Sequence, residues 1–132
     1  MKLKILIFSL LLAVFFSSEV AFARQIGYFT NFKVDYSSTG QESLTGSRTK
    51  AVTNRRGAIN LSDDTGSAWI TATMRNSNGA YRGRTDVQRG KRATFATPGA
   101  EATYNYRLGL KKTNNTGGGT VRITGSWSPD ER

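Results

Sequence analysis

Arginine is the residue type in this sequence that is best suited to chemistry. After position 23, 12 of the 17 basic residues are Arg, and the planar guanidinium binds phosphate and carboxylate groups better than the ammonium of Lys does. Nine basic residues fall into two local groups: Arg48, Lys50, Arg55 and Arg56 around one turn, and Arg82, Arg84, Arg89, Lys91 and Arg92 around one loop. If the two groups meet in space, they form an anion-binding patch. The alternative, a solvated basic face that keeps the protein soluble, stays equally open.

Two aromatic residues could support such a patch. Tyr81 immediately precedes the second basic group, and Trp69 faces away from the apolar side of its expected strand. An aromatic ring next to Arg can stack on a sugar or a base. Such rings more often complete a core or cover a sheet edge. Tyr81 and Trp69 are therefore candidates for stacking, with a structural role as the alternative.

The composition argues against catalysis. The chain of 132 residues contains no His and no Cys, which excludes disulfides, Ser/His/Asp and Cys/His nucleophile systems, and Zn sites built from Cys and His. The adjacent carboxylates are Asp63-Asp64 and Asp130-Glu131, which we interpret as a turn and a solvated polar tail rather than as a catalytic pair. We expect a binding protein that is not an enzyme, with no cofactor and no metal.

The first 23 residues have the pattern of a secretory signal peptide. Lys2 and Lys4 precede an apolar run at residues 5–16, and positions 21–23 read Ala-Phe-Ala, a cleavage site of the A-x-A type. The run is too short for a transmembrane helix, which needs about 20 apolar residues. We expect a secreted, extracellular protein in which residues 24–132 form a single domain. Removal of residues 1–23 lowers the formal net charge only from +10 to +9, so the basic excess belongs to that domain.

Alternation of apolar and polar residues recurs along the rest of the chain, and no stretch shows a helical periodicity. Turn residues separate the alternating stretches. The pattern predicts an all-β fold, an antiparallel β-sandwich of about seven strands, each with one apolar face. The expected strands cover residues 26–36, 48–53, 58–62, 68–75, 93–97, 102–111 and 120–127.

Three local expectations follow from this pattern. In the first strand the even-numbered residues from Ile26 to Tyr36 form the apolar face. In residues 102–111 the apolar face consists of Ala102, Tyr104, Tyr106, Leu108 and Leu110. The basic segment from Arg82 to Gly90 is a polar loop.

Several short motifs occur in a characteristic order. They read Gly-Ser-Arg-Thr at 46–49, Asp-Thr-Gly at 64–66 followed by Trp69, Val-Gln-Arg-Gly at 87–90, and Ile-Thr-Gly-Ser-Trp-Ser-Pro-Asp-Glu at 123–131. This order resembles a family of small secreted Gram-positive proteins classed as a domain of unknown function, which implies no particular activity or site. A more distant resemblance, in signal peptide, size, charge and strand pattern, is to the lactococcin-type bacteriocins, which are secreted basic β-sandwiches that act at the cell envelope.

The sequence leads to two hypotheses about function. The first is a secreted, non-catalytic β-sandwich whose basic groups bind an anionic cell-envelope component, with bacteriocin-like antimicrobial action as its specific form. Its partner would be an anionic wall polymer or a lipid headgroup, with nucleic acid as a less favoured ligand. The alternative is an extracellular structural or matrix protein that assembles through sheet edges, because Tyr104 to Leu110 shows no charged residue typical of a protected edge inside its apolar face.

Overall fold

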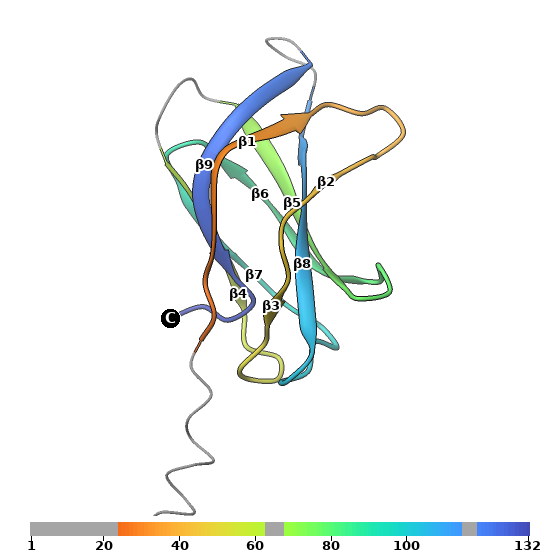
Figure 1. Ribbon diagram of the computed structural model, residues 1–132, viewed down its shortest axis with the longest axis vertical. Coiled ribbons are helices and arrows are strands. Elements are labelled where there is room, and N and C mark those ends of the chain that lie inside the picture. Colours follow the sequence, from red (N-terminus) through yellow and green to blue (C-terminus); the bar gives the residue numbers. More distant parts are fainter. Residues whose placement is uncertain (1–23, 63–67, 115–118) are drawn as a thin grey trace, which may run out of the picture.

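The computed structural model describes residues 24–62, 68–114 and 119–132, which form nine strands and contain no helix (Figure 1). No helical membrane span therefore occurs among these residues. The strands are β1 (Gly27–Asp35), β2 (Ser43–Leu44), β3 (Arg48–Thr49), β4 (Gly57–Leu61), β5 (Trp69–Asn76), β6 (Tyr81–Gln88), β7 (Arg92–Phe95), β8 (Asn105–Lys112) and β9 (Thr120–Ser128).

The strands form two antiparallel sheets. Sheet A has the order β1-β9-β4-β7, and sheet B has the order β2-β8-β5-β6, with β3 also pairing with β8. The all-β antiparallel sandwich predicted from the sequence is thus confirmed. The expected signal peptide at residues 1–23 and the Asp63-Asp64 pair lie outside the described residues.

The core lies between the sheets and is made of the inward side chains of both. Its largest fully enclosed apolar members are Ile59, Leu61 and Ile123 from sheet A and Ile70, Met74, Leu108 and Leu110 from sheet B. The strand expected at 120–127 is confirmed as β9, in which Ile123 and Trp127 are buried on one side. The apolar face expected for residues 102–111 is confirmed in β8 for Tyr106, Leu108 and Leu110, which are buried. Burial of these side chains supplies the main driving force for association of the two sheets.

The segment at 82–90 is not a loop, contrary to the prediction. Residues 81–88 form β6, which pairs with β5 in an antiparallel hairpin whose turn contains Gly79 with φ +82°. The sequence pattern did not indicate this strand, because the strand contributes one apolar side chain to the core, that of Val87, and so shows no alternation. Gly83 occupies the other fully inward position with φ +124°, and a Cβ there would collide with the backbone carbonyl of Ala96. Glycine is required at this position because the backbone of Ala96 approaches β6 so closely.

The first strand changes its inward face in the middle, which the sequence pattern did not predict. Tyr28 is 75% exposed, whereas Phe29 is only 7% exposed. The pairing of β1 with β9 shifts between Phe29 and Phe32, where Asn31 has φ +51°. This bulge inserts one residue, so that odd-numbered positions face the core before it and even-numbered positions after it, as the burial of Val34 shows.

The chain before β8 also departs from the expectation. Thr103 has φ +73°, and the strand begins only at Asn105. Tyr104 is therefore 60% exposed instead of being part of the core, while Tyr106 is 3% exposed. Ala102 lies in the turn that precedes the strand. Alternation alone could not reveal where the strand begins.

The C-terminal segment is not a solvated tail, which corrects a further prediction. The carboxylate of Asp130 and the ammonium of Lys50 form an ion pair with an Nζ to Oδ1 distance of 3.3 Å, and both side chains are 0% exposed. Lys50 Nζ also donates to the carbonyl oxygens of Arg55 and Pro129, each at 2.6 Å. We call this ion pair and its hydrogen bonds the C-terminal clasp.

The carboxylate of Asp130 is held from the other side by the backbone. It accepts the N–H groups of Ala51 at 2.7 Å and Val52 at 3.0 Å. Burial lowers the pKa of Lys50 below its ordinary value, and the charge of Asp130 opposes that shift. The clasp therefore satisfies two buried charges that would otherwise be very costly to keep inside the protein.

The substitution Asp130→Ala should strongly destabilise the protein. It leaves the ammonium of Lys50 buried without its counter-charge and removes the acceptor of two backbone N–H groups, which costs about 3–5 kcal/mol. Equilibrium unfolding in urea measures this loss. Glu131→Ala is the matched control, because it removes a neighbouring carboxylate that forms no ion pair with the described residues. An equal effect of the two substitutions would show that the clasp does not stabilise the fold.

Candidate anion-binding face

The nine basic residues singled out in the sequence do not form one patch. Two of them are inside the protein: Lys50 belongs to the clasp, and Arg89 is 8% exposed and donates from Nη2 to the carbonyl of Arg122 at 2.8 Å. Arg48 is half-buried and donates to the carbonyls of Ile26 and Ser47. These three cations hold segments of the chain together and are not surface ligands for an external anion.

The remaining six are spread over different surfaces. Arg84 is exposed on the outer face of sheet B, opposite Thr73. Arg82 lies at one end of the sandwich, where it lines a pocket. Lys91 and Arg55 are exposed in loops next to β7 and β4 respectively. The last two, Arg56 and Arg92, lie on the outer face of sheet A.

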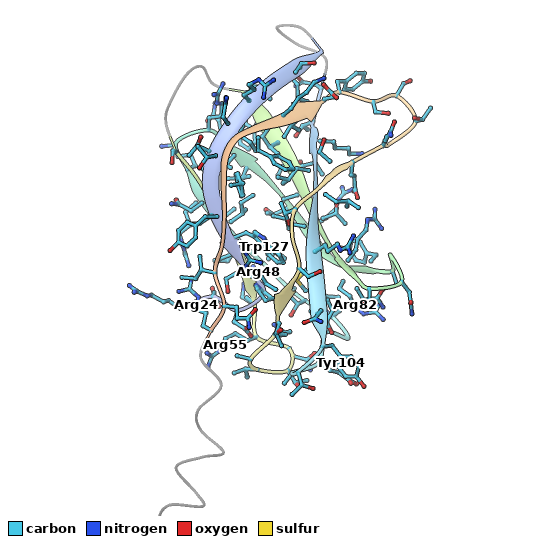
Figure 2. The ribbon with its side chains drawn as sticks, in the orientation of Figure 1. Arg24, Arg48, Arg55, Arg82, Tyr104 and Trp127 are labelled. Atoms are coloured by element: carbon cyan, nitrogen blue, oxygen red, sulfur yellow. The ribbon has the colours of Figure 1, made fainter. Side chains whose placement is uncertain are left out.

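One member of each basic group thus reaches the same surface. Arg56, in the loop before β4, donates from Nε to Thr94 Oγ1 on β7 at 3.3 Å. Arg92 lies two residues before Thr94 on the same strand, so its side chain points to the same side of the sheet. Arg24 and Arg92 both line a shallow furrow on this side, together with Asn60, Ser126 and Ser128. Figure 2 labels Arg24 near the start of β1.

The strand order of sheet A builds a row of polar groups beside these arginines. Tyr28 on β1 pairs with Ser126 on β9, Ser126 pairs with Asn60 on β4, and Asn60 pairs with Arg92 on β7. With strands about 4.8 Å apart, the row spans about 14 Å. We call the surface formed by Arg24, Arg56 and Arg92 with this row the arginine face.

The arginine face carries three guanidinium groups that form no ion pair with the described residues. The ion pairs among the described residues are Lys50–Asp130 and Arg75–Glu42, so no carboxylate in that part of the chain pairs with Arg24, Arg56 or Arg92. Arg24 Nε donates to the backbone carbonyl of Asp130 at 2.6 Å, which fixes its position but does not neutralise its charge. Three guanidinium groups are thereby available to an anion.

The outer face of sheet B is different, because carboxylates lie among its cations, which are Arg75, Arg84, Arg107 and Lys111. Arg75 forms two hydrogen bonds with the carboxylate of Glu42, at 2.7 and 3.1 Å, which raise the pKa of Arg75. Asp86 accepts a hydrogen bond from Thr71 Oγ1 at 2.7 Å and shares this face with Arg84. The positive groups of sheet B are thus interspersed with carboxylates.

The two predicted stacking residues also lie on sheet B. Trp69 is 46% exposed and Tyr81 is 51% exposed. They pair with Gln88 and Arg75, at opposite ends of the β5–β6 hairpin. Neither adjoins the arginine face. The arginine face contains one aromatic side chain of its row, Tyr28, which the sequence pattern assigned to the core because the bulge in β1 leaves no sequence signal.

The described part of the chain contains no cluster of side chains that could hold a metal ion. Such a cluster would be a group of three or more His, Cys, Asp or Glu, and residues 24–62, 68–114 and 119–132 contain none. The furrow of the arginine face is shallow, with a volume of about 30 Å³. Its shape suits contact with an extended ligand rather than enclosure of a small one.

Comparisons with known proteins add nothing to this geometry: no family model, no curated protein and no solved structure matches the chain. The resemblances to a family of small secreted Gram-positive proteins and to lactococcin-type bacteriocins therefore stay predictions.

Acetylation of lysines in the folded protein should distinguish an enclosed Lys50 from a surface lysine. N-hydroxysuccinimidyl acetate should modify Lys91 rapidly and Lys50 about 100-fold or more slowly, because modification of Lys50 requires the clasp to open. Peptide mass spectrometry measures both rates. In urea the two lysines should react alike. Equal rates in the folded protein would contradict the buried position of Lys50.

Proposed function

We propose that this protein is a secreted, non-catalytic binding protein that holds an anionic cell-envelope polymer on the arginine face. The observation that carries the proposal is the convergence of Arg24, Arg56 and Arg92, from three separate segments, on one sheet face where they form no ion pair with the described residues. Guanidinium groups bind phosphate and carboxylate with paired hydrogen bonds. Cleavage after residue 23 would add an α-ammonium group to Arg24 and strengthen this face.

The neutral groups of the face favour a polymer that carries hydroxyl groups between its charges. Asn60 and Ser126 supply hydrogen-bond donors and acceptors in the row that leads to Arg92. Tyr28, at the far end of the row, offers an exposed ring. An extended wall polymer can contact the whole row, whereas a single lipid headgroup would occupy only a part of it.

Nucleic acid fits the face less well. Single strands are bound without sequence preference by basic grooves in which successive bases stack on several aromatic rings. Here Tyr28 belongs to the arginine face, while Trp69 and Tyr81 lie on the other sheet. We therefore favour a polymer of phosphate or carboxylate groups without bases.

Assembly through sheet edges, the alternative function, loses the observation that motivated it. The strand that contains Leu108 and Leu110 is β8, which lies between β5 on one side and β2 and β3 on the other. It presents no free edge. The strands at the ends of sheet A interrupt further pairing: β1 contains the bulge at Asn31, and β7 has four residues and carries the exposed Arg92.

Binding to lipoteichoic acid should depend on salt and on the arginine face. With about three phosphate contacts, and a salt dependence like that of a single-stranded polyanion, affinity should fall about 20-fold between 50 and 200 mM NaCl. The triple variant R24Q/R56Q/R92Q should bind at least about tenfold more weakly and lose most of the salt dependence. Isothermal titration calorimetry measures both quantities.

A matched control separates this local effect from net charge. The variant R84Q/R107Q/K111Q removes three positive charges from the outer face of sheet B and should retain most of the affinity. Equal losses of affinity in the two triple variants, or an affinity that salt does not weaken, would contradict the proposal.

The specific form of the proposal is bacteriocin-like antimicrobial action. If polymer binding leads to killing, the purified protein should inhibit growth of a Gram-positive indicator strain, and R24Q/R56Q/R92Q should require a several-fold higher concentration. Inhibition that is equally strong in the triple variant would contradict a role of the arginine face in killing. Absence of inhibition by the original protein would remove the antimicrobial form and leave polymer binding to be judged by calorimetry.

A further inference from the structure

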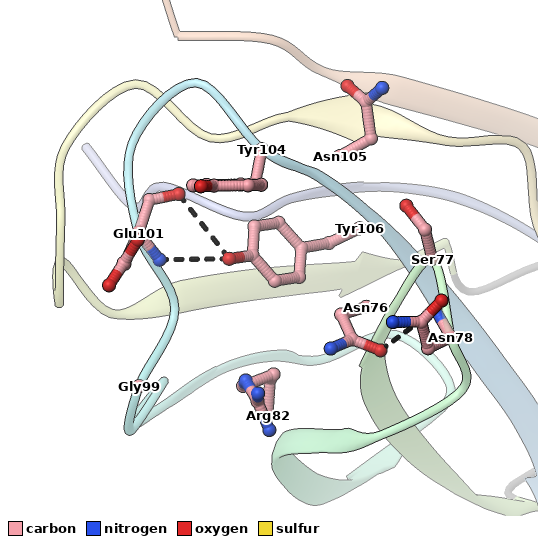
Figure 3. Close-up of a pocket in the computed structure, with 9 residues that line it drawn as sticks. All are labelled: Asn76, Ser77, Asn78, Arg82, Gly99, Glu101, Tyr104, Asn105 and Tyr106. Carbon is pink, nitrogen blue, oxygen red and sulfur yellow. Dashed lines mark hydrogen bonds between the residues drawn. The ribbon is translucent and has the colours of Figure 1, made fainter.

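A second polar pocket lies at one end of the sandwich and shares no residue with the arginine face (Figure 3). Its volume is about 280 Å³. The β5–β6 turn forms one wall, the segment before β8 forms another, and Arg82 and Gly99 lie at its base in the view of Figure 3. The pocket is large enough for a single ring with its substituents.

The walls of the pocket are held in place by hydrogen bonds. The side-chain oxygen of Asn76 accepts the backbone N–H groups of Asn78 at 3.0 Å and Ala80 at 2.8 Å. The hydroxyl of Tyr106 accepts the N–H of Glu101 at 2.8 Å and donates to its carbonyl. Both turns are thereby fixed, which reduces the entropy that a ligand must overcome to bind there.

The fixed walls present both donors and acceptors to the pocket. The two bonds to the oxygen of Asn76 leave its amino group on the side that faces Arg82 in Figure 3. Arg82 uses Nη1 for the carbonyl of Tyr81 at 2.7 Å, which leaves further N–H groups for a ligand. Glu101 and Asn78 also line the pocket, whereas the side-chain amide of Asn105 points away from Arg82 in Figure 3 and accepts a hydrogen bond from Thr49.

One aromatic ring borders this polar lining. Tyr104 is 60% exposed and precedes β8, where the left-handed backbone of Thr103 turns it away from the core. Figure 3 shows its ring above that of Tyr106, at the rim of the pocket. An exposed ring next to fixed polar groups can cover the apolar face of a ligand while those groups bind its edge.

We infer that this pocket binds a neutral sugar ring, with Tyr104 covering one face of the ring and Arg82, Asn76 and Glu101 binding its hydroxyl groups. Each sugar hydroxyl both donates and accepts hydrogen bonds, and the pocket offers partners of both kinds. One guanidinium and one carboxylate leave no excess charge that would select a phosphate. The inference is independent of the proposed function, because the two surfaces share no residue.

The test is an NMR titration of the folded protein with two neutral trisaccharides, tri-N-acetylchitotriose and maltotriose, each at about 10 mM, well above the Kd of about 1 mM expected for a weak ligand. At least one should shift the backbone amides of Gly99 and Glu101 and the side-chain amide of Asn76. The shifts should persist at 500 mM NaCl, because salt does not screen the binding of a neutral ligand. Binding of a polyanion through about three phosphate contacts would instead weaken strongly at that salt concentration.

Two tyrosine variants make the test specific. Tyr104→Ala should weaken binding about tenfold, which corresponds to about 1.4 kcal/mol. Tyr81→Ala, which removes a similarly exposed ring that does not line the pocket, should leave binding unchanged. The inference is overturned if neither trisaccharide shifts these resonances, if both variants weaken binding equally, or if inorganic phosphate produces the same shifts and salt abolishes them. None of these outcomes bears on polymer binding to the arginine face.

Discussion

The buried ion pair between Lys50 and Asp130 is the interaction on which the candidate binding surface depends. It joins the loop after β3 to the segment after β9, two parts of the chain that are 80 residues apart. Around it, the carbonyl of Asp130 accepts a hydrogen bond from Arg24, and the N–H of Glu131 donates to the carbonyl of Arg56 at 2.6 Å. Two of the three arginines of the arginine face are thus positioned by the clasp. A buried ion pair contributes little net stability compared with apolar packing, so its value here is better understood as fixing where these segments lie.

The two outer faces of the sandwich differ in how their positive charges are paired. On sheet B, Glu42 lies over Gly109, where a Cβ would collide with its carboxylate, and binds Arg75. Asp86 provides a second negative charge on that face. On sheet A, Arg24, Arg56 and Arg92 have no such partner among the described residues. The formal net charge of +10 does not convey this difference in pairing.

The sequence predicts the sandwich well because most strands alternate cleanly, as Leu108, Leu110, Ile123 and Trp127 illustrate. It fails where the backbone departs from a regular strand. The bulge at Asn31 exchanges the positions of Tyr28 and Phe29, and the left-handed Thr103 exposes Tyr104. It fails again where a strand has almost no apolar side chain, as in β6.

The candidate sites lie beyond the reach of local pattern for a different reason. Residues 28, 126, 60 and 92 form one row only because the strand order is β1-β9-β4-β7. Local grouping suggested instead that neighbours such as Lys50 and Arg56 act together. One of them is enclosed with a carboxylate, and the other is exposed. Charge in a sequence therefore identified the type of ligand that we propose, but only the pairing of strands indicates where it would bind.

The central claim is that an anionic polymer binds sheet A and not sheet B, and mapping of backbone amide chemical shifts tests it most directly. A titration with soluble poly(glycerol phosphate) should shift the amides of Asn60, Arg92 and Ser126, while those of Arg84 and Asp86 stay in place. Shifts that are centred on sheet B, or spread evenly over both faces, would contradict the account.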